Sequence, residues 1–120
     1  MIVENPADIA QFDAAQFQGV PLAHTEHSKT MLVCLEPEQA IPVHHPGIDL
    51  TLVILEGRAT LVGPDGEAEA GAGAVLHAEA GQPRGLKAHQ RTLAIATVAP
   101  PPGEGDHDEV HQHLAAGTWR

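Results

Sequence analysis

Short apolar segments separated by turn residues recur along most of the chain. Several of the turns contain glycine or proline, as in the GPDG stretch at residues 63–66. Strands this short, with turns at regular intervals, are typical of an all-β sandwich or barrel. The segments with strand character cover residues 29–36, 40–44, 50–55, 58–62, 67–70, 74–78 and 92–99.

The two ends of the chain follow other patterns. Asn5, followed by proline, predicts a short helical turn within residues 5–17. The prolines at 100–102 cannot continue a sheet, and Asp106 is expected to cap a short helix over 107–116. The 120 residues are predicted to form one domain. Its parts are an N-terminal arm (1–28), a β-barrel (29–99) and a Pro-rich linker with a short helical tail (100–120).

Composition excludes several classes of partner. Sixteen Asp and Glu against six Lys and Arg give this acidic protein a net charge of −10, and only two Phe, one Trp and no Tyr are present. Without a basic cluster or stacking aromatics, we expect no binding to nucleic acid. The longest apolar run, residues 50–55, is far short of the ~20 residues that cross a bilayer, so we expect no membrane association.

The chain carries one cysteine, Cys34, so no disulfide can form within it. Its first residues, MIVENPADIA, lack the basic start and apolar centre of a signal peptide. Both observations predict a cytoplasmic protein. We expect Cys34 to be a small buried core residue, since no nearby cation marks it as a nucleophile.

Nine histidines are the unusual chemical feature. Two of them, His44 and His45, stand side by side in PVHHPGIDLTLVILEG (42–57), before an apolar run that ends at a glycine. Histidine is the commonest metal ligand and titrates near neutral pH. The functional hypotheses therefore depend on where these rings lie.

Residues 31–98 resemble the cupin superfamily. LEPEQAIPVHHP (35–46) and LVILEGRATL (52–61) are similar to the beginning and end of the first cupin motif, and AGAGAVLHAEAGQPRG (70–85) resembles the second in its placement and glycine spacing. The resemblance implies a cupin-type double-stranded β-helix, or jelly-roll barrel. In this family, histidines and a glutamate on neighbouring strands hold a divalent metal.

The metal-binding positions of those motifs are degenerate in this sequence. Leu50 stands at the glutamate position, and the adjacent pair of histidines provides one ligand in each register instead of two. Arg84 replaces the third histidine, and a guanidinium is not a metal ligand. A metal site, if present, would use His44, His45 and Asp49, and Asp49 faces inward only if the strand register is shifted. The cofactor is predicted to be none, or one of Fe, Mn, Ni, Zn or Cu.

Three residues are candidate contacts for a small-molecule ligand: Arg84, His45 and His77. An inward Arg84 can bind a carboxylate or phosphate, whereas the alternative is a pair with Glu79, Glu56 or another surface acid. His77 lies in the apolar context AVLHA, which favours a core histidine with its hydrogen bonds satisfied.

The tail adds further histidines, His107, His111 and His113. The first two are spaced i, i+4, a spacing that can chelate a metal. A solvated polar helix, or a tail that covers a neighbour's barrel, are the alternatives.

Three functions remain open. The first is a cupin-like barrel that binds a small polar or anionic molecule with weak or absent metal binding. The second is a metal-dependent dioxygenase or isomerase with a non-standard His/Asp site, so the sequence does not decide whether the protein is an enzyme. The third is a structural or interaction module with a filled barrel.

The outward side chains of residues 50–55 also need cover, by another sheet, the N-terminal segment or a second subunit, and we expect a homodimer.

Overall fold

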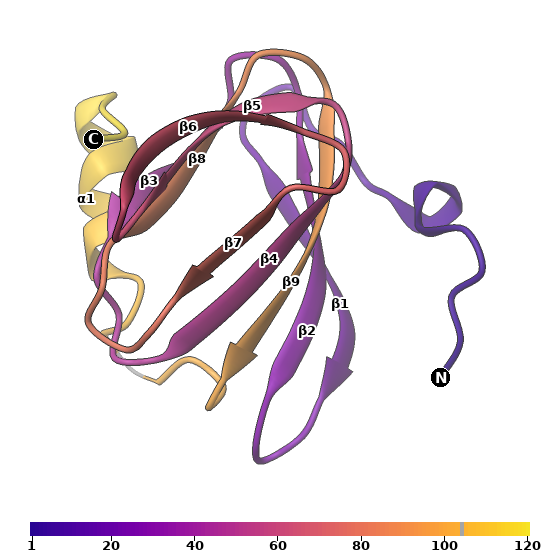
Figure 1. The fold of residues 1–120 in the computed structure, drawn as a ribbon, viewed down its shortest axis with the longest axis horizontal. Helices are drawn as coiled ribbons and strands as arrows, with labels where there is room; N and C mark the ends of the chain where they lie inside the picture. Colours follow the sequence, from indigo (N-terminus) through magenta and orange to yellow (C-terminus); the bar gives the residue numbers. More distant parts are fainter. Residues whose placement is uncertain (104) are drawn as a thin grey trace.

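The computed structural model describes residues 1–103 and 105–120. Almost all of its regular structure is β (Figure 1). The strands are β1 (Gln18–His24), β2 (Lys29–Leu35), β3 (Ala40–His44), β4 (Asp49–Glu56), β5 (Arg58–Gly63), β6 (Gly66–Gly71), β7 (Val75–Ala78), β8 (Arg84–Ala88) and β9 (Thr92–Ala99). The helices are the 3-10 helix η1 (Pro6–Ile9) and the α-helix α1 (Asp108–Ala116).

The strands form two antiparallel sheets that face each other. The five-stranded sheet has the order β1-β2-β9-β4-β7, and the four-stranded sheet has the order β3-β8-β5-β6 (Figure 1). The predicted all-β jelly roll with a short C-terminal helix is confirmed. The five-stranded sheet also includes β1, whose residues lie within the predicted N-terminal arm.

Strand alternation decides which side chains form the core between the sheets. In β4, Leu50, Leu52 and Ile54 are buried whereas Asp49 and Thr51 are exposed, as a regular strand requires. The outward side chains of residues 50–55 are exposed or half-buried, so the cover that the sequence predicts for them is incomplete within this chain. The core between the sheets contains Val33, Leu35, Leu50, Leu52, Ile54, Leu61, Leu76 and Leu86 with several alanines.

The turn between β4 and β5 depends on Gly57. Its φ of +99° is a conformation that side-chain-bearing residues rarely adopt. A Cβ at this position would also collide with the backbone of Arg91 and Thr92. This tight turn therefore requires glycine, and it fixes where β5 begins.

The N-terminal arm covers part of the outer face of the five-stranded sheet. Leu32, Cys34 and Leu93 are buried there, with Phe12 of the arm packed against them. The predicted helical turn is confirmed as η1, whose cap Asn5 accepts a hydrogen bond from the backbone N–H of residue 7. The arm thus supplies some of the cover that the outward apolar side chains need, and Cys34 is a core residue as predicted.

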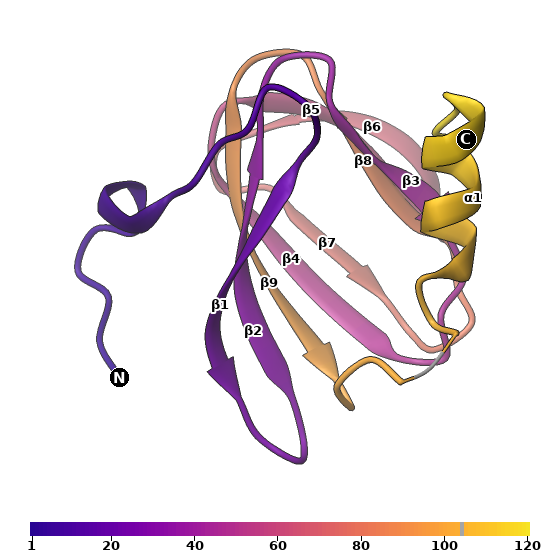
Figure 2. The same cartoon turned by 180° about the vertical axis from the view of Figure 1, so that it is seen from behind.

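The C-terminal helix lies on the opposite side of the molecule from the N-terminus, against β3 (Figure 2). Val110 is its buried residue. The predicted range is confirmed, but the predicted cap is wrong. His107 precedes the helix without a side-chain capping bond, whereas Asp106 accepts hydrogen bonds from the backbone N–H groups of Gly103 and Gly47. None of the described helices is long and apolar enough to span a membrane.

Candidate functional site

A cavity of about 260 Å³ lies between the two sheets, and α1 closes one side of it. Its wall is mainly apolar and includes side chains from both sheets. The polar side chains among the described lining residues are Gln16, His44, His107 and His111. The apolar lining residues are Phe17, Gly19, Met31, Val33, Ile41, Leu50, Leu52, Leu76, Gly85, Leu86, Ala96, Val98, Pro102, Val110 and Leu114.

His44 is the polar group that the barrel itself presents to the cavity. It is the last residue of β3, whose pairing with β8 is irregular between Ile41 and His44, so that both of these residues line the cavity, and it is 8% exposed. Its Nδ1 lies 2.9 Å from the carbonyl oxygen of Pro42. Burial lowers the pKa of His44, and the positive charge of Arg84 on the neighbouring strand lowers it further. The ring is therefore neutral at pH 7.

His45 points away from the cavity, because it follows His44 on an extended chain. Its backbone N–H and its Nδ1 both donate to the carboxylate of Glu109 on α1, at 2.9 and 3.0 Å. These hydrogen bonds lower the pKa of Glu109. The prediction that His45 contacts a ligand or metal inside the barrel is wrong: this residue attaches the helix to the barrel.

The tail histidines do line the cavity. His107 and His111 lie on the helix face that also carries Val110 and Leu114, and this face closes the chain's own barrel. The rings of His107 and His44 are edge to face, with centroids 6.3 Å apart. His107, His111 and Leu114 are nevertheless exposed, so the helix is largely solvated and only Val110 of this face is buried.

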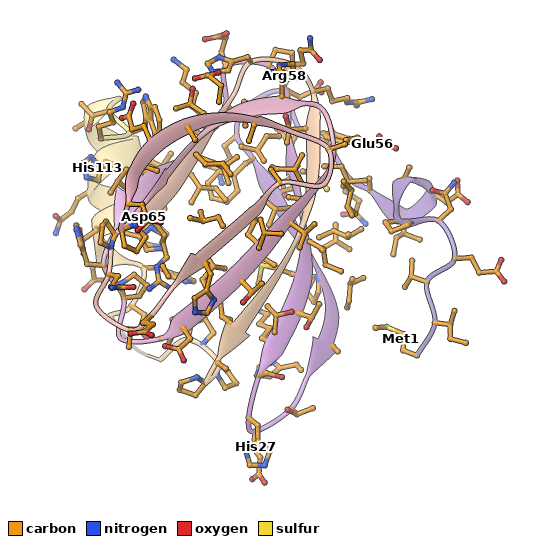
Figure 3. All side chains as sticks on the ribbon, viewed as in Figure 1. Met1, His27, Glu56, Arg58, Asp65 and His113 are labelled. Carbon is orange, nitrogen blue, oxygen red and sulfur yellow. The ribbon has the colours of Figure 1, made fainter. Side chains whose placement is uncertain are left out.

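Two further contacts hold the tail in place. The backbone N–H of Val43 donates to the carbonyl of Trp119 at 2.6 Å, next to His44 in the sequence. On the outer side of the helix, His113 hydrogen-bonds the Thr118 hydroxyl. Figure 3 shows His113 on α1, and His27 at the far tip of the β1–β2 hairpin. His24 and His27 are exposed.

Arg84 is buried but does not line the cavity. It is 3% exposed, and its Nη2 donates to the backbone carbonyls of Glu79 and Gln82 at 2.9 and 3.3 Å. Its Nη1 has no hydrogen-bond partner among the described residues. The guanidinium thus braces the turn before β8, and its hydrogen bonds among the described residues go to backbone carbonyls instead of the predicted surface carboxylate. Its contact with a ligand stays a prediction.

Asp49 and His77 face outward. Asp49 accepts a hydrogen bond from the backbone N–H of Ala80 at 2.8 Å, and His77 hydrogen-bonds the Thr51 hydroxyl at 3.0 Å. Asp49 as an inward metal ligand is wrong, because β4 keeps its regular register at this end. The placement of His77 in the core is also wrong, since β7 turns its neighbours Leu76 and Ala78 inward.

The spacing of His107 and His111 was noted from the sequence, but the two apolar tail residues of the cavity, Val110 and Leu114, were not, although a signal for them exists. His107, Val110, His111 and Leu114 follow the i, i+3, i+4, i+7 spacing of one helix face. Two apolar residues on that face predict contact with a core. The polar composition of the remaining tail obscured this pattern.

The fold and its interior cavity define a small jelly-roll protein of the double-stranded β-helix class. Among solved structures, TT1209 from Thermus thermophilus is 27% identical, covers 83% of this chain and 98% of its own, and superposes with a TM-score of 0.76. An RmlC-like cupin from Desulfovibrio desulfuricans is 30% identical, with coverage of 83% and 97% and a TM-score of 0.74.

More distant structures share the fold. KdgF from a Halomonas species is 18% identical over 73% of this chain and 82% of its own, with a TM-score of 0.68. No protein-family model matches the sequence, and no curated protein matches it. The chain belongs to the cupin superfamily.

The metal that the superfamily often binds does not fit the residues present. Among residues 1–103 and 105–120, no three His, Cys, Asp or Glu side chains are placed to share a metal ion. Leu50 and Arg84 occupy positions where the motifs have ligands, and Arg84 places a positive charge near His44. A cation beside His44 would have to overcome this repulsion without a carboxylate on the cavity wall.

Proposed function

We propose that this protein binds a small, mainly apolar molecule in the barrel cavity, with its single polar group at the histidine end. The supporting observation is the cavity of about 260 Å³, whose wall is apolar except for Gln16 and the three histidines. Burying an apolar body in such a cavity is favourable by roughly 25 cal/mol per Å² of surface. No metal is required for this binding.

The size of the cavity limits the ligand. An engineered cavity of roughly 150 Å³ with an apolar wall binds benzene, which has six non-hydrogen atoms. In proportion, about 260 Å³ accepts a molecule of about ten non-hydrogen atoms. The sequence favoured a polar or anionic ligand held by Arg84. The apolar wall supports a hydrocarbon body instead, with polarity limited to one end.

The alternatives have less support. A metal-dependent dioxygenase or isomerase needs a ligand set that the described residues do not assemble. A barrel filled by its own side chains would leave no cavity of this size.

Toluene tests the proposal as a neutral apolar probe. At ten times its Kd it should stabilise the protein by about 1.4 kcal/mol, which raises the Tm by about 5 °C. Val98→Phe fills part of the cavity and should abolish this shift. The matched control Val75→Phe lies on the outer face of β7 and should retain it. No toluene-induced shift, or an equal shift in both variants, contradicts the proposal.

A further inference from the structure

The hydrogen bond of His44 fixes which ring nitrogen carries the proton. Its Nδ1 lies 2.9 Å from the Pro42 carbonyl oxygen, which can only accept. Nδ1 must therefore be the donor, whatever the charge of the ring. In the neutral ring the remaining nitrogen, Nε2, has a lone pair and no hydrogen.

Nε2 has no partner among the described residues. His44 lines the cavity. Nη1 of Arg84 is a fully buried atom without a hydrogen-bond partner, whereas no ring nitrogen of His44 is in that situation. A hydrogen-bond acceptor at the end of an apolar cavity needs a donor, because an unpaired polar group in such a place costs free energy.

The charges around His44 favour the neutral ring. Burial is the largest cause that lowers the pKa of His44, and the charges of Arg84 on β8 and His107 before α1 lower it further, whereas the hydrogen bond to the Pro42 carbonyl raises it without reversing the net shift. Glu109 on α1 favours the charged form, but its carboxylate is bonded to His45. The site therefore presents a lone pair to its ligand.

Building on the proposed function, we infer that the polar group of the ligand is a neutral hydroxyl that donates its proton to Nε2 of His44. A phenol or alcohol with a hydrocarbon body of fewer than about ten non-hydrogen atoms has this chemistry. Its oxygen can also accept from a ring N–H of His107 or His111, which line the same end. A carboxylate has no proton to donate, so it can replace the hydroxyl at Nε2 only if the buried His44 becomes charged.

Three probes of one shape separate these cases: toluene, p-cresol and 4-methylbenzoate. Their Kd values are measured by calorimetry at pH 7.5 for the wild type, His44→Phe and the matched control His77→Phe, whose side chain is exposed. In His44→Phe, the selectivity for p-cresol over toluene should fall about tenfold, because the hydroxyl loses its partner. Toluene affinity should stay within about twofold, and His77→Phe should leave both Kd values unchanged.

The outcomes distinguish this inference from the proposed function. If toluene binds and His44→Phe leaves the selectivity unchanged, the hydroxyl inference is overturned and the apolar cavity stands. Tighter binding of 4-methylbenzoate than of p-cresol to the wild type also overturns it, because that result requires a charged ring. If none of the three probes binds, both proposals fail.

A measurement on the wild type avoids dependence on the fold of the His44 variant. Two-bond ¹H–¹⁵N NMR spectra of the histidine rings identify the tautomer of each. We expect His44 to be protonated at Nδ1 at pH 7.5, and its Nε2 resonance to shift on addition of p-cresol but much less on addition of toluene. A proton on Nε2 of the neutral ring would overturn the inference.

Discussion

The adjacent histidines His44 and His45 contact different parts of the molecule. At the end of β3, His44 reaches the cavity, whereas His45, the next residue, reaches Glu109 on the helix. Residue-scale alternation was predictable from the sequence where the strand was recognised, as for Leu50 inside and Asp49 outside. Alternation was not applied to His77, because the apolar residues around it led to the prediction that its side chain is also in the core.

The buried His44 should make stability depend on pH. Its pKa is lower in the folded protein than in the unfolded chain, where it is about 6.5, so the unfolded chain binds more protons as the pH falls below that value. Stability should therefore decrease as the pH falls from 7.5 toward 5. Urea unfolding of His44→Phe should show a weaker decrease than that of His77→Phe. Parallel pH profiles for the two variants would contradict a buried neutral ring.

Gly57 provides a second prediction at this scale. Gly57→Ala places a Cβ against the backbone of Arg91 and Thr92 and keeps a strained φ, so it should cost about 3 kcal/mol in the free energy of unfolding. Gly73→Ala has a similar φ of +91° but nothing within 4 Å of its Cβ, and should cost about 1 kcal/mol. Equal losses in urea denaturation would show that the collision has no energetic cost.

At the scale of elements, the tail is a lid attached by polar contacts around one apolar face. Turn chemistry and alternation were enough to predict most strands and the helix range. The position of the tail was not predictable from local patterns, because its packing depends on contacts with β3, more than sixty residues earlier in the chain. Asp106 was expected to cap the helix, but it accepts a hydrogen bond from Gly47 in the loop before β4.

Removing the Glu109 contact should loosen the lid. Glu109→Gln weakens both hydrogen bonds to His45, and because these groups are half exposed the loss of stability should be only about 0.5 kcal/mol. Trp119, the sole tryptophan, reports the docking of the tail. Its fluorescence should become more accessible to acrylamide in Glu109→Gln. Glu36→Gln breaks an ion pair with Arg91, distant from the tail, and should leave the quenching unchanged.

At the scale of the whole molecule, the outer face of the five-stranded sheet carries an uncharged band. Cross-strand partners place five apolar side chains in one row, from the edge strand β7 to the edge strand β1. The row is Val75, Val53, Ile95, Leu32 and Val20. Threonines on β2, β9 and β4 form a parallel polar row beside it.

This band is where we expect two copies to associate. Leu32 is buried with the N-terminal arm packed against it, whereas Val75 is exposed and Val53, Ile95 and Val20 are half-buried. In a chain of net charge −10, the accessible part of this uncharged row is a surface on which two copies meet without charge repulsion. Light scattering at micromolar concentration should give the mass of a dimer. Val53→Lys should produce monomers. Val62 is a half-buried valine on β5 of the four-stranded sheet, so the variant Val62→Lys should remain dimeric. A monomeric wild type would contradict the expected homodimer.

The docking of α1 also implies that two processes in this protein have different rates, namely release of the tail and unfolding of the barrel. The strands within each sheet are joined by backbone hydrogen bonds, whereas the tail is held by a few polar contacts and by Val110. Local opening of such a segment needs less free energy than global unfolding. A trapped molecule can therefore leave by transient release of the tail while the barrel stays folded. Residence time is then governed by the tail sequence, and the shape of what fits is governed by the strands.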